Sequence, residues 1–80
     1  GISHIMQEDL YLDLRQLNCP LPILKTKKAL AQMPAGSVLK IVATDVGVPA
    51  DFTVFCQQTG HTLLSCDTQA GEHTLYIQHK

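Results

Sequence analysis

The organisation of this chain is decided by the stretch Asn18-Cys19-Pro20-Leu21-Pro22-Ile23-Leu24-Lys25. Proline lacks an N–H and holds φ near the helical value, so both prolines suit a first helical turn, where N–H groups have no intrahelical partner. The residue before a proline favours extended backbone, which suits a helix N-cap. The stretch therefore predicts a helix that begins at Pro20, with Cys19 as its N-cap.

A cysteine at this position is a candidate nucleophile. Its sulfur would lie at the positive end of the helix dipole, with the N–H of Leu21 as the nearest free donor. Such placement lowers a thiol pKa from about 8.5 into the range of roughly 3.5–7.5. The plainer interpretation is that Cys19 is a small buried residue and the prolines only start the helix. We favour the reactive thiol because two prolines frame it, where one would start a helix.

The residues around this stretch alternate between strand and helix patterns. Residues 10–15 alternate leucine with polar or aromatic residues, which predicts a strand with one apolar face. The helix is predicted to run from Pro20 to about Met33 and to end at Pro34-Ala35-Gly36. Its buried face is expected to carry Ile23, Thr26, Leu30 and Met33.

The second half of the chain repeats the pattern. Residues 38–44 are β-branched and apolar and predict a buried strand. Pro49 suits the first turn of a second helix, which Asp45 is expected to cap and Gly60 to end. The apolar face of this helix is expected to contain Phe52, Phe55, Cys56 and Thr59.

Two further strands are predicted at residues 61–67 and 72–78, joined by a turn at 68–71. Leu75 and Ile77 are expected to face the core. The order βαβαββ, with right-handed crossovers, favours an α/β two-layer sandwich. We expect a mixed four-stranded sheet with both helices packed on one face.

Length and composition limit the possible functions. The chain has 80 residues, 45% of them hydrophobic, and a net charge of −1. We expect residues 1–5 to be a cloning remnant and residues 6–80 to form a single domain. Residues 1–5 do not resemble a signal peptide. No apolar run approaches the ~20 residues that cross a bilayer, so no membrane partner is expected. The charge argues against a dedicated nucleic-acid binder.

The remaining chemical groups are few. Three cysteines without a Cys-x-x-Cys pair indicate free thiols in a reducing, cytoplasmic compartment. Cys56 is expected to be a core residue, whereas Cys66 lies in a strand and has no predicted role. The histidines lack metal-ligand spacing, so no metal or other cofactor is expected.

Four basic residues surround the cysteine stretch in the sequence: Arg15, Lys25, Lys27 and Lys28. Such a group would attract an acidic partner surface. Lys25 and Lys28 are three residues apart on the predicted helix, away from its apolar face. We predict that these two lysines steer the docking of a partner protein.

These features together resemble the TusA family of sulfur-carrier proteins, also called SirA-like. The resemblance covers about residues 10–80, and its most specific element is Cys19-Pro20-Leu21-Pro22. The other matching segments are Leu12-Asp13-Leu14, Lys25 with Lys27-Lys28, Ala43-Thr44-Asp45, Asp51-Phe52, Phe55-Cys56 and Thr59-Gly60-His61.

The resemblance implies a carrier rather than a self-sufficient enzyme. Cys19 would hold sulfane sulfur as a persulfide, framed by Pro20 and Pro22. A cysteine desulfurase or rhodanese-like donor would load it, and an acceptor protein in tRNA thiolation, sulfur oxidation or cofactor synthesis would receive the sulfur. Leu21 differs from the Cys-Pro-Glu-Pro of the tRNA-thiolation members, and Gln16 stands where a glycine is common.

Two other functions remain open from the sequence. A regulatory or RNA-binding module can have the same arrangement of strands and helices, although that is an analogy of fold alone. A peroxide-sensing thiol would also use Cys19, through a sulfenic acid. The resemblance and the net charge favour protein partners over direct nucleic-acid contact.

Overall fold

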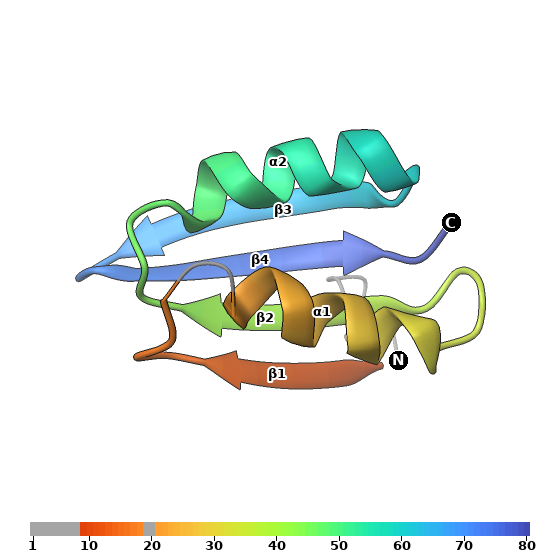
Figure 1. Ribbon diagram of the computed structural model, residues 1–80, viewed down its shortest axis with the longest axis horizontal. Helices are drawn as coiled ribbons and strands as arrows, with labels where there is room; N and C mark the ends of the chain where they lie inside the picture. The colour runs from red at the N-terminus through yellow and green to blue at the C-terminus, as the bar shows by residue number, and fades with distance from the viewer. Residues whose placement is uncertain (1–8, 19–20) are drawn as a thin grey trace, which may run out of the picture.

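The computed structural model describes residues 9–18 and 21–80 and contains the predicted order of elements. The expected cloning remnant and the predicted helix start at Pro20 lie outside the described residues. Figure 1 shows four strands and two helices, which are β1 (Leu10–Leu14), α1 (Leu21–Ala31), β2 (Val38–Ala43), α2 (Val48–Thr59), β3 (Thr62–Gln69) and β4 (Glu72–Gln78). Among the described residues, no helix is long and apolar enough to cross a membrane.

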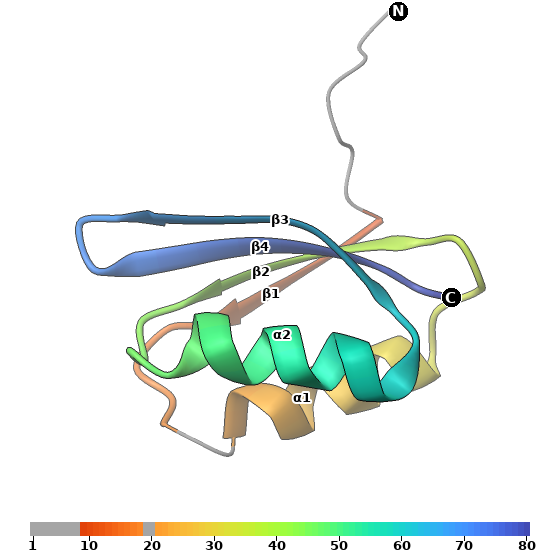
Figure 2. The same ribbon diagram turned by 90° about the horizontal axis from the view of Figure 1, so that it is seen from above.

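The strands form one mixed sheet in the order β1-β2-β4-β3. β1 pairs with β2 in parallel, and β4 pairs antiparallel with both β2 and β3. Figure 2 shows both helices on one face of this sheet, which confirms the predicted two-layer sandwich. The ends of β1 and β2 and the starts of α1 and α2 lie at one side of the molecule (Figure 1), which we call the carboxyl-end edge.

The core lies between the sheet and the helices. Phe52 is fully buried on α2, and Leu75 and Ile77 are fully buried on β4, as predicted. Burial of each such side chain contributes roughly 1.5–3 kcal/mol. The predicted face of α1 is confirmed at Thr26 and Leu30, with Ile23 partly buried. α1 ends at Ala31, two residues before the predicted end, and Met33 beyond it is partly buried; Pro22 is buried as well. The remaining buried core residues are Leu14, Leu39, Ile41, Ala43, Val48, Phe55 and Cys56.

The hairpin between β3 and β4 is tighter than the sequence predicted. β3 extends to Gln69, which pairs with Glu72, so the turn has only Ala70 and Gly71. Their φ angles are 51° and 79°, both positive, as a type I′ turn requires. The hydroxyl of Thr68 also lies 2.8 Å from Nδ1 of His73 across the strand pair. The predicted turn at 68–71 was therefore two residues too long at its start.

Ala70 is poorly suited to this turn, because left-handed backbone costs a residue with a Cβ roughly 1–2 kcal/mol. Asparagine tolerates that conformation, and Asn-Gly is a preferred pair for type I′ turns. We expect Ala70→Asn to raise the free energy of unfolding by about 0.5–1 kcal/mol, measured by urea denaturation. Ala35→Asn is the matched control, at an exposed position whose φ is not positive, and should bring no gain. Equal effects of the two substitutions would contradict this account of the turn.

Candidate functional site

The described residues that flank the predicted nucleophile lie at the carboxyl-end edge. The N–H of Leu21 donates a hydrogen bond of 2.8 Å to the carbonyl oxygen of Asn18. Cys19 and Pro20 lie between them, outside the described residues, so the predicted N-cap and the first proline of the motif remain predictions. Pro22, the second proline, is a buried residue in the first turn of α1.

The connection from β1 to α1 is anchored to the end of β2. The N–H of Gln16 donates to the hydroxyl of Thr44 at 2.9 Å, and the N–H of Leu17 donates to the carbonyl of Leu14 at 3.3 Å. Leu17 packs against the core. Gln16 has a φ of 69°, a conformation that favours glycine. Sequence patterns did not predict this anchor, although the glycine that is common at this position in the resembled family was an available signal.

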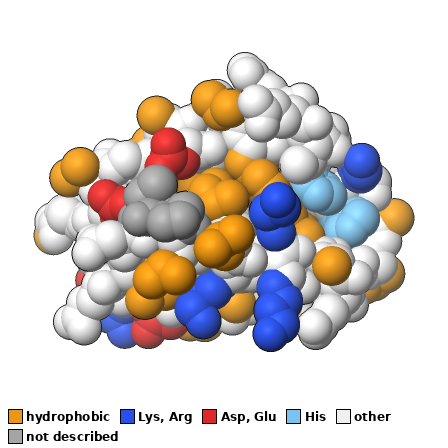
Figure 3. All heavy atoms as spheres, viewed as in Figure 1, with side chains coloured by type: hydrophobic (Ala, Val, Ile, Leu, Met, Phe, Trp, Pro, Cys, Tyr) orange, Lys and Arg blue, Asp and Glu red, His pale blue; other side chains and the backbone are white. Residues whose placement is uncertain are grey.

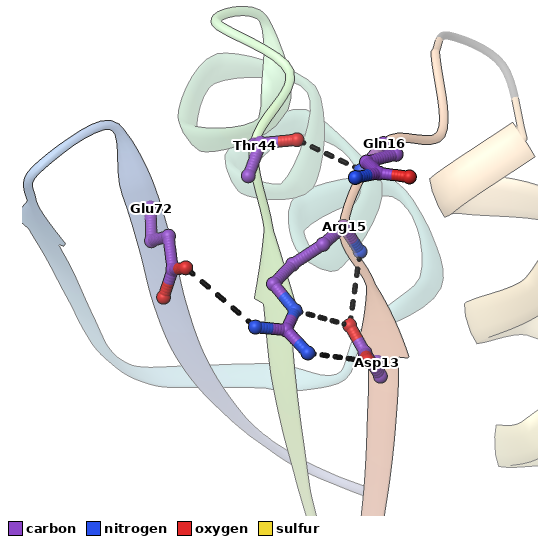
Figure 4. A network of polar contacts seen from close by, with 5 residues as sticks. All are labelled: Asp13, Arg15, Gln16, Thr44 and Glu72. Carbon is purple, nitrogen blue, oxygen red and sulfur yellow. Dashed lines mark hydrogen bonds and ion pairs between the residues drawn. The ribbon is translucent and has the colours of Figure 1, made fainter.

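Arg15 is engaged on the sheet surface that the helices leave open. Its Nε donates to Oδ1 of Asp13 at 2.8 Å and its second guanidinium nitrogen donates to Oδ2 at 2.9 Å, while Glu72 lies 3.7 Å away (Figure 4). The hydrogen bonds from Arg15 lower the pKa of the Asp13 carboxyl, and the same contacts raise the pKa of Arg15. Of the four basic residues that the sequence places around the cysteine stretch, Arg15 pairs with these carboxylates and does not join the lysines.

The three lysines of α1 divide between two grooves. Lys25 and Lys28 line a hollow of about 270 Å³ together with Leu10 and Leu12 of the edge strand β1. Lys27 lines a separate groove between α1 and α2. Figure 3 shows lysine and hydrophobic side chains next to one another on this side of the molecule. The structure thus places the two lysines that were predicted to steer docking in one hollow and separates Lys27 from them.

Exposed leucines add an apolar component to this surface. Leu21 and Leu24, in the first turns of α1, are 44% and 52% exposed, and Leu10 at the start of β1 is 39% exposed. Leu10 was expected on the apolar face of its strand. It is exposed because β1 is an edge strand, with β2 on one side only. Sequence periodicity does not reveal such exposure, since it cannot identify which strand forms the edge.

The start of α2 is organised differently from the prediction. Its N-cap is Gly47, and no side chain caps it. Oδ1 of Asp45 accepts a hydrogen bond of 3.3 Å from the N–H of Gly47, and the Asp45 carbonyl accepts one from the N–H of Val48. Asp45 therefore stabilises the turn before the helix. The prediction that Asp45 caps α2 is wrong, because the N-cap is Gly47, two residues later.

The other two cysteines have environments that disfavour the thiolate. Cys56 is buried, as predicted, and burial raises the pKa of its thiol. Cys66 is exposed, yet partial burial and the nearby carboxylate of Asp67 raise the pKa of its thiol too. Within residues 9–18 and 21–80, no three histidine, cysteine or acidic side chains form a group that could hold a metal ion.

Comparison with known proteins identifies the family. Residues 10–79 match the family described as sulfurtransferase TusA. A putative sulfur carrier protein of Neisseria meningitidis is 59% identical over 69 residues, which are 86% of this chain and 93% of that protein. The sulfur carrier protein TusA of Allochromatium vinosum is 44% identical over 70 residues, covering 88% and 92% of the two chains.

A solved structure agrees with the fold. The SirA-like protein from Desulfitobacterium hafniense superimposes with a TM-score of 0.76 at 21% identity, over 86% of this chain and 95% of that one. Its likeness supports the sandwich architecture, while the family match rests on sequence along nearly the whole chain. The chain belongs to the TusA family.

Proposed function

We propose that this protein is a sulfur carrier that holds sulfane sulfur as a persulfide on Cys19. A cysteine desulfurase or rhodanese-like protein donates the sulfur, and an acceptor protein takes it away. The observation that carries the proposal is the family match over residues 10–79, which spans the Cys19-Pro20-Leu21-Pro22 motif. Three cysteines without a Cys-x-x-Cys pair support a cytoplasmic location. We also propose that residues 6–80 form a single carrier domain.

The transfer is an exchange between sulfur atoms. The Cys19 thiolate attacks the outer sulfur of the donor persulfide, so a new S–S bond forms while the donor S–S bond breaks and the donor cysteine leaves as a thiolate. An acceptor thiolate then attacks the outer sulfur, and Cys19 leaves as a thiolate. One sulfur atom moves at each step and no net oxidation occurs.

A helix start favours both steps. A thiol of pKa 8.5 is only about 3% ionised at pH 7, and one of pKa 6.5 is about three quarters ionised. The lower pKa also makes Cys19 a better leaving group in the second step. Pro20 and Pro22 frame the cysteine in this proposal. The burial of Pro22 in α1 supports a fixed frame.

The open face of the sheet offers one feature of an RNA-binding module. Nζ of Lys40 lies 5.7 Å from the ring centroid of Tyr11 and 5.8 Å from that of Tyr76, and the three residues form a row across paired strands. Exposed aromatic side chains on a sheet can stack on bases. The acidic residues Asp13, Asp67 and Glu72 share this face by their register, so it would repel phosphates. The carrier is therefore the better supported function.

Sulfur loading tests the proposal directly. After incubation with a cysteine desulfurase and free cysteine, the intact mass of the chain should increase by one sulfur atom, and dithiothreitol should remove it. Cys19→Ser should abolish the gain, whereas the matched variant Cys66→Ser, at the exposed cysteine of β3, should retain it. A gain that persists in Cys19→Ser would refute the assignment. Formation of a sulfenic acid with peroxide, without loading by the desulfurase, would favour a peroxide sensor.

The two remaining thiols should not compete with Cys19 at neutral pH. Because the pKa values of Cys56 and Cys66 are raised, less thiolate is present than in an ordinary cysteine, and reactivity is gained only as pH rises. In Cys19→Ser, iodoacetamide should modify Cys66 slowly at pH 7 and about tenfold faster at pH 8. Cys56 should react only after unfolding. Peptide mass mapping measures both sites, and rapid pH-independent labelling of Cys66 would contradict the assignment.

Lys25 and Lys28 are proposed to steer the donor. Reversing both to glutamate should slow sulfur transfer from an acidic-surfaced donor by about 5- to 10-fold at low salt, because rim charges act mainly on the association rate. High salt should shrink the difference. A further control compares Lys25→Glu alone with Lys40→Glu, on the opposite face, because these two variants change the net charge equally. The pH profile of Cys19 alkylation by a neutral reagent should change little. A shifted profile with unchanged transfer would show that the lysines act on the thiol instead.

A further inference from the structure

A second groove lies between the two helices and has no role in the sulfur chemistry. Its volume is about 250 Å³, and the residues that matter are Lys27, Leu30, Phe55, His61, His79 and Lys80. Leu30 and Phe55 are buried and form an apolar floor. The lysines and histidines provide a polar rim, and Figure 3 shows the two histidines together beside a lysine. α1 separates this groove from the hollow that Lys25 and Lys28 line.

The side chains of the rim are basic, and the main-chain oxygen of Lys80 lies 2.7 Å from Nδ1 of His79. No acidic side chain lines the groove. Among the described residues, both ion pairs belong to Arg15, so Lys27 and Lys80 have no acidic partner. Two of the six lysine and arginine residues therefore concentrate here in a chain whose net charge is −1. Such a rim favours a ligand that brings negative charge.

The histidine pair supplies oriented donors. The rings of His61 and His79 lie edge to face with centroids 4.8 Å apart, and the ring of Phe55 lies 5.9 Å from that of His61. The backbone N–H of Lys80 donates to Nδ1 of His61 at 3.2 Å, which leaves the proton of the neutral ring on Nε2. Burial, and then His79 and Lys80, lower the pKa of His61. The neutral ring of His61 can therefore donate a hydrogen bond from its Nε2–H.

The apolar floor and cationic rim together select the kind of ligand. A volume of about 250 Å³ suits one large side chain better than a whole cofactor. A peptide segment can satisfy both parts, with an apolar side chain against Leu30 and Phe55 and flanking carboxylates toward the rim.

We propose that the groove between α1 and α2 binds an acidic peptide segment of a partner protein, through an apolar side chain flanked by carboxylates. Lys27 and Lys80 attract the carboxylates, and Nε2–H of His61 donates to one of them. The site lies apart from the hollow of Lys25 and Lys28, so one partner can occupy it while the other hollow stays open. The proposal does not depend on persulfide formation, so it can be tested in a chain that carries no sulfur.

The experiment is a nuclear magnetic resonance titration of the full ¹⁵N-labelled chain. The probe is an end-blocked pentapeptide with phenylalanine at its centre and glutamate at the other four positions, and a second peptide carries glutamine at those positions. The ring signals of His61 and His79 and the amide signal of Lys27 should shift and saturate with the glutamate peptide. Lys27→Glu combined with Lys80→Glu should weaken this binding by about 5- to 10-fold or more.

The matched control reverses Lys25 and Lys28 to glutamate, which changes the net charge equally but leaves this groove intact. It should leave the affinity reported by the His61 and His79 signals within about twofold. Equal weakening by both double variants would overturn the proposal, as would equal binding of the glutamine peptide or no shift with the glutamate peptide. A stronger response of the same signals to a short poly-uridine RNA would overturn it in favour of a phosphate site.

Discussion

The constraint on which the rest of this structure depends is the parallel pairing of β1 with β2. Parallel neighbours need a crossover connection, and a helix packed on the sheet provides it. Leu14 therefore pairs with Ala43 where both strands end, and the chain enters both helices from the same edge. Burial of Leu14, Ala43, Val48 and Phe52 fixes this edge from inside. The segment between β1 and α1 therefore starts from a buried residue, Leu14.

Sequence patterns predicted the elements and their order because each is strongly periodic or clearly interrupted. The predictions of alternating burial in β4 and of an apolar face on α2 were correct. Their side chains in the core are Leu75, Ile77, Phe52 and Phe55. Features that depend on contacts between distant segments were harder to predict from the sequence. The bond from Gln16 to Thr44 joins residues that are 28 positions apart, and the second ion pair of Arg15 reaches Glu72 on β4. The division of the α1 lysines between two grooves also depends on the neighbouring elements, which are β1 on one side and α2 on the other.

The distribution of charge around α1 gives the helix two different sides. Toward β1, Lys25 and Lys28 flank the leucines of the edge strand, and toward α2, Lys27 faces the histidine pair. The opposite face of the sheet holds Lys40 between two tyrosines, with carboxylates nearby by register. A small carrier must meet a donor and an acceptor in turn. Two lysine-lined grooves on one helix fit that need in the proposed function.

The measurement that tests the account most directly is a single-turnover discharge. The chain is loaded with one labelled sulfur, purified away from its donor, and mixed with an acceptor protein that carries a reactive thiol. The account predicts that the labelled sulfur leaves Cys19 and appears on the acceptor in equal amount, while the carrier returns to its unloaded mass. Retention of the label on Cys19, or its release only as free sulfide, would contradict the role of a carrier.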